Sequence, residues 1–134
     1  MHESSHAVIG IFFHLRVDRM WVNPKTGSGR CFFDMPSDPV VFGCVLIAGS
    51  VGESIWCGRT NREITIDDYK DAKKKRISQA GMSALIPRVR GILRSHKKEV
   101  MVLAKALKKE NHLGFTQVVK ILGLKKNYWK EKKK

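Results

Sequence analysis

Apolar residues near the start of the chain recur every three or four positions, as they do along one face of an α-helix. The residues of this stripe are Ala7, Val8, Ile11, Phe12 and Leu15. The pattern predicts a helix over residues 2–15. Two short apolar runs follow at 20–22 and 31–33, and the proline and glycines between them predict two strands joined by a loop or hairpin.

The longest apolar stretch covers residues 40–52, and Asp38 is placed to cap a helix that begins at 39 or 40 and ends near Trp56. A helix that is apolar on all sides is normally buried, and its glycines would let another helix approach closely. These glycines are Gly43, Gly49 and Gly52. Because a bilayer needs about 20 apolar residues, we expect no membrane span. With no secretory signal pattern either, we expect a cytoplasmic protein.

The second half of the chain follows a helical pattern from residue 77 onward. Segments 82–94 and 97–109 each carry apolar residues on one face and Lys or Arg on the other, with Pro87 near a helix start or a kink. Residues 111–114 have the composition of a turn. Thr116 is placed to cap a last short helix.

Positive charge is concentrated in this second half. The formal net charge is +14, and residues 73–134 hold 19 Lys/Arg against 3 Asp/Glu, whereas residues 1–72 hold 7 against 9. Such a field attracts nucleic acid or an acidic partner without specifying which. We predict one domain over residues 1–124, in which 73–124 form a basic helical half, and a solvated basic tail at 125–134.

Residues 2–6 read His-Glu-Ser-Ser-His, a complete HExxH motif. Positions four apart lie on one face of a helix, so His2 and His6 can hold one zinc ion with Glu3 beside it. Two neutral imidazoles leave room for a third protein ligand and a water of lowered pKa. Glu3 would take the proton of that water and pass it to the leaving amine. The alternative is a pair of surface histidines on a frayed helical turn.

A zinc ion held by two histidines needs a third protein ligand, and no third histidine has suitable spacing. Asp67 and Asp68 follow Thr65, which is placed to cap a helix. One of these carboxylates could complete the metal site, or both could simply be favoured in a first turn by the helix dipole. Glu53 is likewise either a buried partner of a metal ligand or an exposed carboxylate at a helix end.

The second predicted strand is a candidate for substrate binding. Residues 30–34 are expected at the edge of the sheet, where Arg30, Cys31, Phe32 and Phe33 could align an extended peptide through backbone hydrogen bonds. The three cysteines of the chain show no CxxC spacing, so we expect reduced thiols rather than a disulfide framework or a second zinc site.

The order of these segments resembles the zinc-peptidase domain of the FtsH-type membrane AAA+ proteases, whose pattern is HEAGHA, GGRAAEE and SNDLxxAT. The matching segments here are HESSHAVIG, GRCFFDMP, AGSVGE, the aspartates at 67 and 68, and ILRSHKKEVMVLAKALKKENHLGFTQVVKIL. The resemblance covers nearly the whole chain and implies a mainly α-helical fold with a small two- to three-stranded sheet. By position it implies His2, His6 and Asp68 as zinc ligands, Glu3 as the catalytic glutamate, and Glu53 as a support for the site.

The resemblance also implies a zinc metalloendopeptidase that hydrolyses unfolded or flexible polypeptides, with Zn²⁺ as its cofactor. The chain contains no GxxxxGK[ST] phosphate loop, so cleavage would be independent of ATP and any ATPase would be a partner. The alternative is a peptidase-like fold reused to bind nucleic acid or protein through residues 73–134, or an inactive zinc-bound adaptor. A homo-oligomer is a further option, because the family forms rings.

Overall fold

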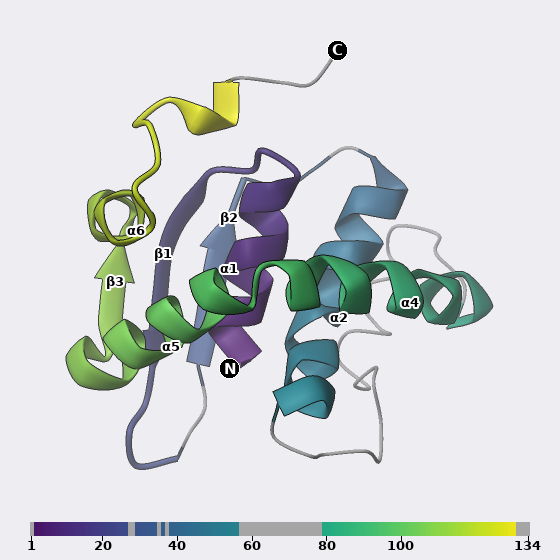
Figure 1. Ribbon diagram of the computed structural model, residues 1–134, viewed down its shortest axis with the longest axis horizontal. Coiled ribbons are helices and arrows are strands. Elements are labelled where there is room, and N and C mark those ends of the chain that lie inside the picture. The colour runs from purple at the N-terminus through teal and green to yellow at the C-terminus, as the bar shows by residue number, and fades with distance from the viewer. Residues whose placement is uncertain (1, 27–28, 35, 37, 57–78, 131–134) are drawn as a thin grey trace.

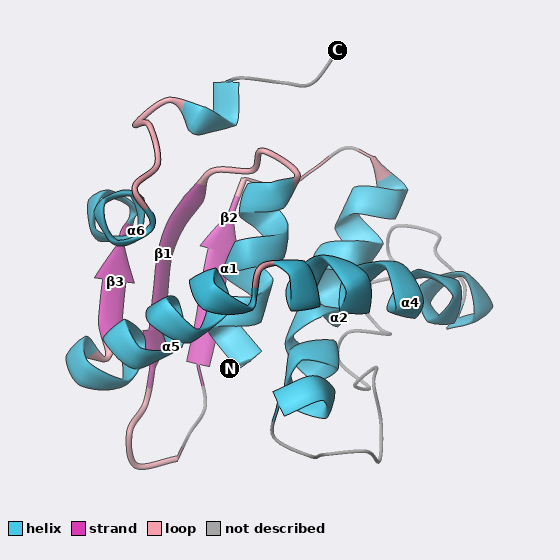
Figure 2. Ribbon diagram, viewed as in Figure 1, coloured by secondary structure: helices cyan, strands magenta, loops and turns pink. Residues whose placement is uncertain are grey.

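The computed structural model describes residues 2–26, 29–34, 36, 38–56 and 79–130. Its elements are, in chain order, α1 (His2–Phe12), β1 (Val17–Val22), β2 (Gly29–Phe33), α2 (Pro39–Trp56), α4 (Gln79–Ser95), α5 (Lys97–Glu110), β3 (His112–Gly114), α6 (Phe115–Leu122) and a 3-10 turn, η1 (Tyr128–Lys130). Figure 2 distinguishes the helices from the strands. The predicted fold class is confirmed, because the protein is mainly helical with a small three-stranded antiparallel sheet.

The sheet has the strand order β2-β1-β3, with β1 in the centre. The predicted pair of strands is confirmed as the β1–β2 hairpin, in which Met20 lies opposite Cys31.

The prediction of a turn over residues 111–114 is wrong beyond Asn111. Asn111 ends α5 with a left-handed backbone, at a φ of 64°. The next three residues then pair with β1 as β3, with Leu113 opposite Met20, because pairing satisfies backbone groups of both strands.

Helix α1 lies between the sheet and α2, and α5 crosses over it (Figure 1). Its buried residues include Ala7 and Val8 of the predicted stripe, and also Ile9, which lies outside that stripe. Core side chains from α2, α4 and α5 pack around this helix, among them Ile47, Leu93 and Leu103. These three residues and Ile9 are each 0% exposed.

Helix α2 begins where the sequence predicts. The backbone N–H of Val40 donates to Oδ1 of Asp38 at 2.8 Å, which caps the first turn. Gly52 lies against α1, where an added Cβ would overlap Ser5.

α2 is long and apolar enough to cross a membrane, with a mean hydropathy of 1.5, and 56% of it is buried inside the protein. The core helices of soluble proteins meet the same test of length and composition.

The structure decides two expected details of the later helices. Pro87 lies inside α4, so its predicted position near a helix start is wrong and the predicted kink remains the other alternative. Thr116 is not the cap of α6, because β3 carries the chain in an extended conformation as far as Gly114, which is itself the N-cap residue. The N–H of Gly114 donates to Oε1 of Gln117 at 2.8 Å. The helix therefore begins at Phe115, one residue before the predicted cap.

The C-terminal segment is attached to the domain through Tyr128, which is 7% exposed. Its hydroxyl donates to the carbonyl oxygen of Leu15 at 2.7 Å and accepts from the N–H of Val17 at 3.1 Å. Tyr128 therefore does not belong to a solvated tail, because its side chain supplies partners to the backbone between α1 and β1. Lys125, Lys126 and Lys130 are exposed, as the composition predicts. Residues 131–134 lie outside the described part of the chain.

Tyr128→Phe is expected to lower the free energy of unfolding by about 1–3 kcal/mol, since the buried N–H of Val17 would lose its acceptor. Urea denaturation followed by circular dichroism measures this change. Lys126→Ala is the control, because this exposed side chain lies in the same segment and surface changes usually stay within about 0.5 kcal/mol. Equal urea midpoints for Tyr128→Phe and the wild type would show that the attachment does not stabilise the fold.

Candidate metal centre

The first turn and a half of α1 carries three potential metal ligands. The Nε2 atoms of His2 and His6 lie 3.1 Å apart, as their spacing of four residues on one helical face predicts. Ligand atoms of His2, Glu3 and His6 all lie within 4.8 Å of one another. All three side chains are half-buried, so the cluster lies at the boundary between core and solvent.

The other ring nitrogen of each histidine is held by α2. Nδ1 of His6 lies 2.6 Å from the carbonyl oxygen of Val45. A carbonyl can only accept, so Nδ1 of His6 carries the proton and Nε2 carries a lone pair. Nδ1 of His2 bonds to Oε1 of Glu53, which leaves Nε2 as the outward nitrogen of this ring too. Metal-bound histidines in proteins commonly have such partners, which fix the tautomer and the ring orientation.

The electrostatics of His6 favour the neutral ring. Burial, followed by repulsion from a charged His2, lowers the pKa of His6 to about 3, although the bond to Val45 acts in the opposite direction. His6 therefore carries no positive charge near neutral pH. A neutral imidazole is the form that binds a metal ion, so no proton has to leave Nε2 before it can act as a ligand.

The contact between the two Nε2 atoms needs one donor. A proton on Nε2 of His2, donated to Nε2 of His6, satisfies it as a hydrogen bond at 3.1 Å, and a metal ion that binds both lone pairs would replace that proton. Two Zn–N bonds of about 2.0–2.1 Å would span this 3.1 Å separation at a ligand angle of about 100°, near the tetrahedral value. The donor set therefore fits zinc.

Gly49 of α2 lies against both rings and has no side chain to displace them. A Cβ added at Gly49 would lie 2.5 Å from Nε2 of His2 and 2.5 Å from Nε2 of His6. Any larger residue would therefore push the rings out of their present positions. Val45, Gly49 and Glu53 are spaced by four residues, so one face of α2 holds both rings and lets them approach the helix closely.

No protein-family model matches this chain, and no curated protein does.

Strand β2 passes beside the carboxylate of the cluster. A Cβ added at Gly29, the first residue of β2, would lie 3.1 Å from Cγ of Glu3. Burial raises the pKa of the Cys31 thiol well above its ordinary value, and the Glu3 carboxylate raises it further. Cys31 is therefore protonated at neutral pH. β2 lies at one edge of the described sheet, so its outer backbone groups face away from β1.

The structure brings together most of the predicted site residues. His2, Glu3 and His6 form the cluster, Glu53 contacts His2, and the substrate-strand candidates Arg30, Cys31, Phe32 and Phe33 all lie in β2. Asp67 and Asp68 lie outside the described residues. The carbonyl of Val45 is a partner that sequence analysis missed, because every residue has a carbonyl and only the fold selects one. The signal in the sequence was the position of Val45, which lies four residues before Gly49 and eight before Glu53 and is therefore on the same helical face.

Glu53→Ala is expected to weaken zinc binding by about 10- to 100-fold, because His2 would lose the partner that orients its ring. Competition with a chromophoric chelator measures the affinity. Glu53→Gln keeps an oxygen acceptor for Nδ1 and should lose less. Wild-type affinity in Glu53→Ala would mean that the contact with His2 does not support a metal ligand.

Proposed function

We propose that this protein is a zinc metalloendopeptidase. The observation that supports this most directly is the convergence of two outward-facing Nε2 atoms, 3.1 Å apart, beside the Glu3 carboxylate. Structural zinc sites are usually closed by four protein ligands, whereas catalytic sites keep one position open. Among the described residues the cluster offers two imidazoles as zinc ligands. Its one carboxylate, Glu3, has the position that serves for proton transfer in an HExxH motif. We propose Asp68 as the third ligand.

The residues of the chain divide the chemistry between them. His2 and His6 would hold zinc through Nε2, while Glu53 and Val45 keep the rings in place. Zinc in this site would supply a Lewis acid and a water of lowered pKa. Glu3 accepts a proton from the attacking water, whose oxygen adds to the scissile carbonyl carbon, and Glu3 then donates that proton to the leaving amine. The net reaction adds one water across the peptide bond.

Strand β2 suits an extended peptide. Its outer edge pairs with no other described strand, and its first residue lies against Glu3. A polypeptide that adds to this edge would gain backbone hydrogen bonds without requiring a particular sequence. Such binding needs a chain segment that is already extended. We therefore propose unfolded or flexible proteins as substrates, cleaved without ATP.

Removal of zinc is expected to abolish this activity. The purified protein is incubated with a reduced and alkylated polypeptide, and fragments are followed by mass spectrometry before and after treatment with a zinc chelator. Added Zn²⁺ should restore cleavage, whereas the same substrate in its native, disulfide-bonded form should be cut slowly. Cleavage that persists unchanged without zinc would contradict the proposed function, as would a zinc-loaded protein that cuts no unfolded substrate.

A further inference from the structure

The three-stranded sheet has one face that packs on the core and one that does not. Met20 lies opposite Cys31 on one side and Leu113 on the other, and Met20 and Leu113 are both 0% exposed. Side chains alternate between the faces of a strand, so the neighbours of these residues must point the other way. α1 and α5 lie on the core side, in front of the sheet in Figure 1.

The opposite side, here named the outer sheet face, carries two rows of side chains. One row crosses all three strands, with Trp21 opposite both Arg30 and His112. The next row pairs Arg19 with Phe32, and the guanidinium of Arg19 lies 4.5 Å from the centre of the Phe32 ring. The rows are two residues apart along β1, or about 7 Å. The face therefore combines aromatic rings with cationic side chains.

These side chains are accessible in the described part of the chain. Arg19, Arg30 and His112 are exposed, whereas Trp21 and Phe32 are half-buried. Neither aromatic residue belongs to the described hydrophobic core or to the half-buried apolar residues that pack against it. Asp18 is the single acidic residue of β1, and its carboxylate bonds to Arg16. The outer sheet face thus presents positive charge that no neighbouring β1 carboxylate neutralises.

We propose that the outer sheet face binds single-stranded nucleic acid. Two bases would stack on Trp21 and on the Phe32–Arg19 pair, while Arg30 would contact a phosphate. Aromatic rings interleaved with cations on an antiparallel sheet suit unpaired bases, because every base has a face that can stack and every nucleotide has a charge to neutralise. In a duplex the faces of the bases are already stacked on one another, so the rings of this face would find no partner there.

A peptide substrate does not explain this surface. A strand added at the edge of β2 lies about 4.8 Å beyond it, and therefore about 14 Å from β3, where His112 is located. Trp21 is on the central strand, away from that edge. The proposal does not rest on zinc or on peptide hydrolysis, so a chain without bound metal should bind nucleic acid equally well.

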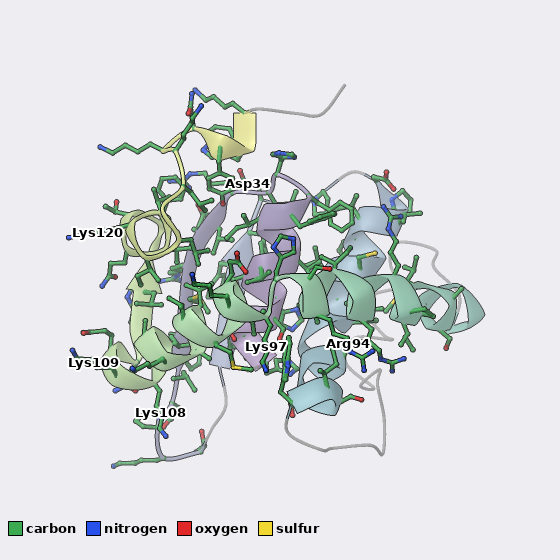
Figure 3. All side chains as sticks on the ribbon, viewed as in Figure 1. Asp34, Arg94, Lys97, Lys108, Lys109 and Lys120 are labelled. Atoms are coloured by element: carbon green, nitrogen blue, oxygen red, sulfur yellow. The ribbon has the colours of Figure 1, made fainter. Side chains whose placement is uncertain are left out.

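The basic helices offer the main competing surface. Residues 79–130 carry 12 Lys/Arg against 2 Asp/Glu, and Figure 3 shows Lys108, Lys109 and Lys120 extending from the end of the molecule where α5 and α6 lie. These exposed cations would attract any polyanion by counterion release, single-stranded or double-stranded. They therefore provide a matched control, because removing charge from α5 tests electrostatic attraction without touching the sheet.

The experiment measures fluorescence anisotropy of a labelled 12-nucleotide oligothymidine and of a labelled 12-base-pair duplex, at several salt concentrations, with zinc removed. We expect tighter binding of the single strand. Trp21→Ala should weaken it by about 5- to 100-fold, and Trp21→Phe should retain most of the affinity. Arg30→Gln should lower the slope of log affinity against log salt by about 0.7. The double variant Lys105→Gln/Lys109→Gln should weaken both probes alike.

Circular dichroism of each variant confirms that the fold is retained. Binding that is equal for both probes and insensitive to Trp21→Ala and Arg30→Gln would overturn the proposal and assign nucleic-acid binding to the basic helices. Polyglutamate is the competitor for an acidic protein partner. If it binds more tightly than oligothymidine and its binding depends on Trp21, the outer sheet face recognises protein instead. Absence of binding to any probe at 50 mM salt would also overturn the proposal.

Discussion

Glu3→Gln is expected to reduce hydrolysis of an unfolded polypeptide by about 10²- to 10⁴-fold while leaving one zinc ion bound per chain. Glutamine has nearly the same shape as glutamate, so the contact with Gly29 of β2 can persist. It cannot accept the proton of an attacking water near neutral pH. The measurement compares turnover of a fluorogenic peptide with zinc content determined by atomic emission.

The control for this variant is Glu110→Gln, which removes the same charge from the exposed end of α5. It should hydrolyse the peptide at the wild-type rate. If Glu3→Gln binds zinc and retains full turnover, Glu3 is not the general base and the proposed mechanism is wrong. If both variants are inactive together with the wild type but all bind zinc, the protein is a zinc-bound adaptor rather than an enzyme.

Gly49→Ala is expected to reduce zinc content from one ion per chain to nearly none without altering a ligand. The added Cβ would lie 2.5 Å from Nε2 of both His2 and His6, so the rings must move apart or lose the bonds of their Nδ1 atoms. Alanine is a better helix former than glycine by about 1 kcal/mol, so helix content should not fall. Zinc content and circular dichroism, measured on the same sample, separate the two effects.

Gly91→Ala is the matched control, because an added Cβ at this glycine of α4 would have no neighbour within 4 Å. It should bind zinc like the wild type and gain up to about 1 kcal/mol in stability. His6→Ala, which removes a ligand outright, sets the lower limit for zinc content. Full zinc occupancy in Gly49→Ala would show that zinc binding does not depend on the close approach of α2 to the two rings.

The structure also separates metal binding from the basic character of the chain. His2 and His6 depend on α2 for their orientation, whereas nine of the 16 Lys and Arg in the described residues lie on α4, α5 and α6. Variants at the metal site and variants on the basic surfaces should therefore act independently, as distant sites usually do. A variant that loses zinc but still binds nucleic acid would support this independence of the metal site and the basic surfaces.

Local spacing along the sequence was enough to predict the elements that carry the site. The interval of four residues between His2 and His6 puts both rings on one helical face whatever surrounds them. The short apolar runs at 20–22 and 31–33, with proline and glycines between them, were enough to predict the hairpin. Asp38 likewise marks the start of α2 through a bond to a residue two positions away. These features depend on neighbours within a few residues, which a sequence displays directly.

The tertiary structure alone decided how those elements are held and where the open surfaces lie. Glu53 and the Val45 carbonyl reach the histidines across 51 and 39 positions of the chain, and Tyr128 reaches Val17 across 111. A backbone carbonyl has no signature in the sequence, and a three-residue strand such as β3 is too short for its pattern to differ from a turn. Packing of α2 against α1 selected Val45, Gly49 and Glu53, because it brings a carbonyl and a carboxylate to the two imidazoles and a glycine to the point where the rings meet the helix.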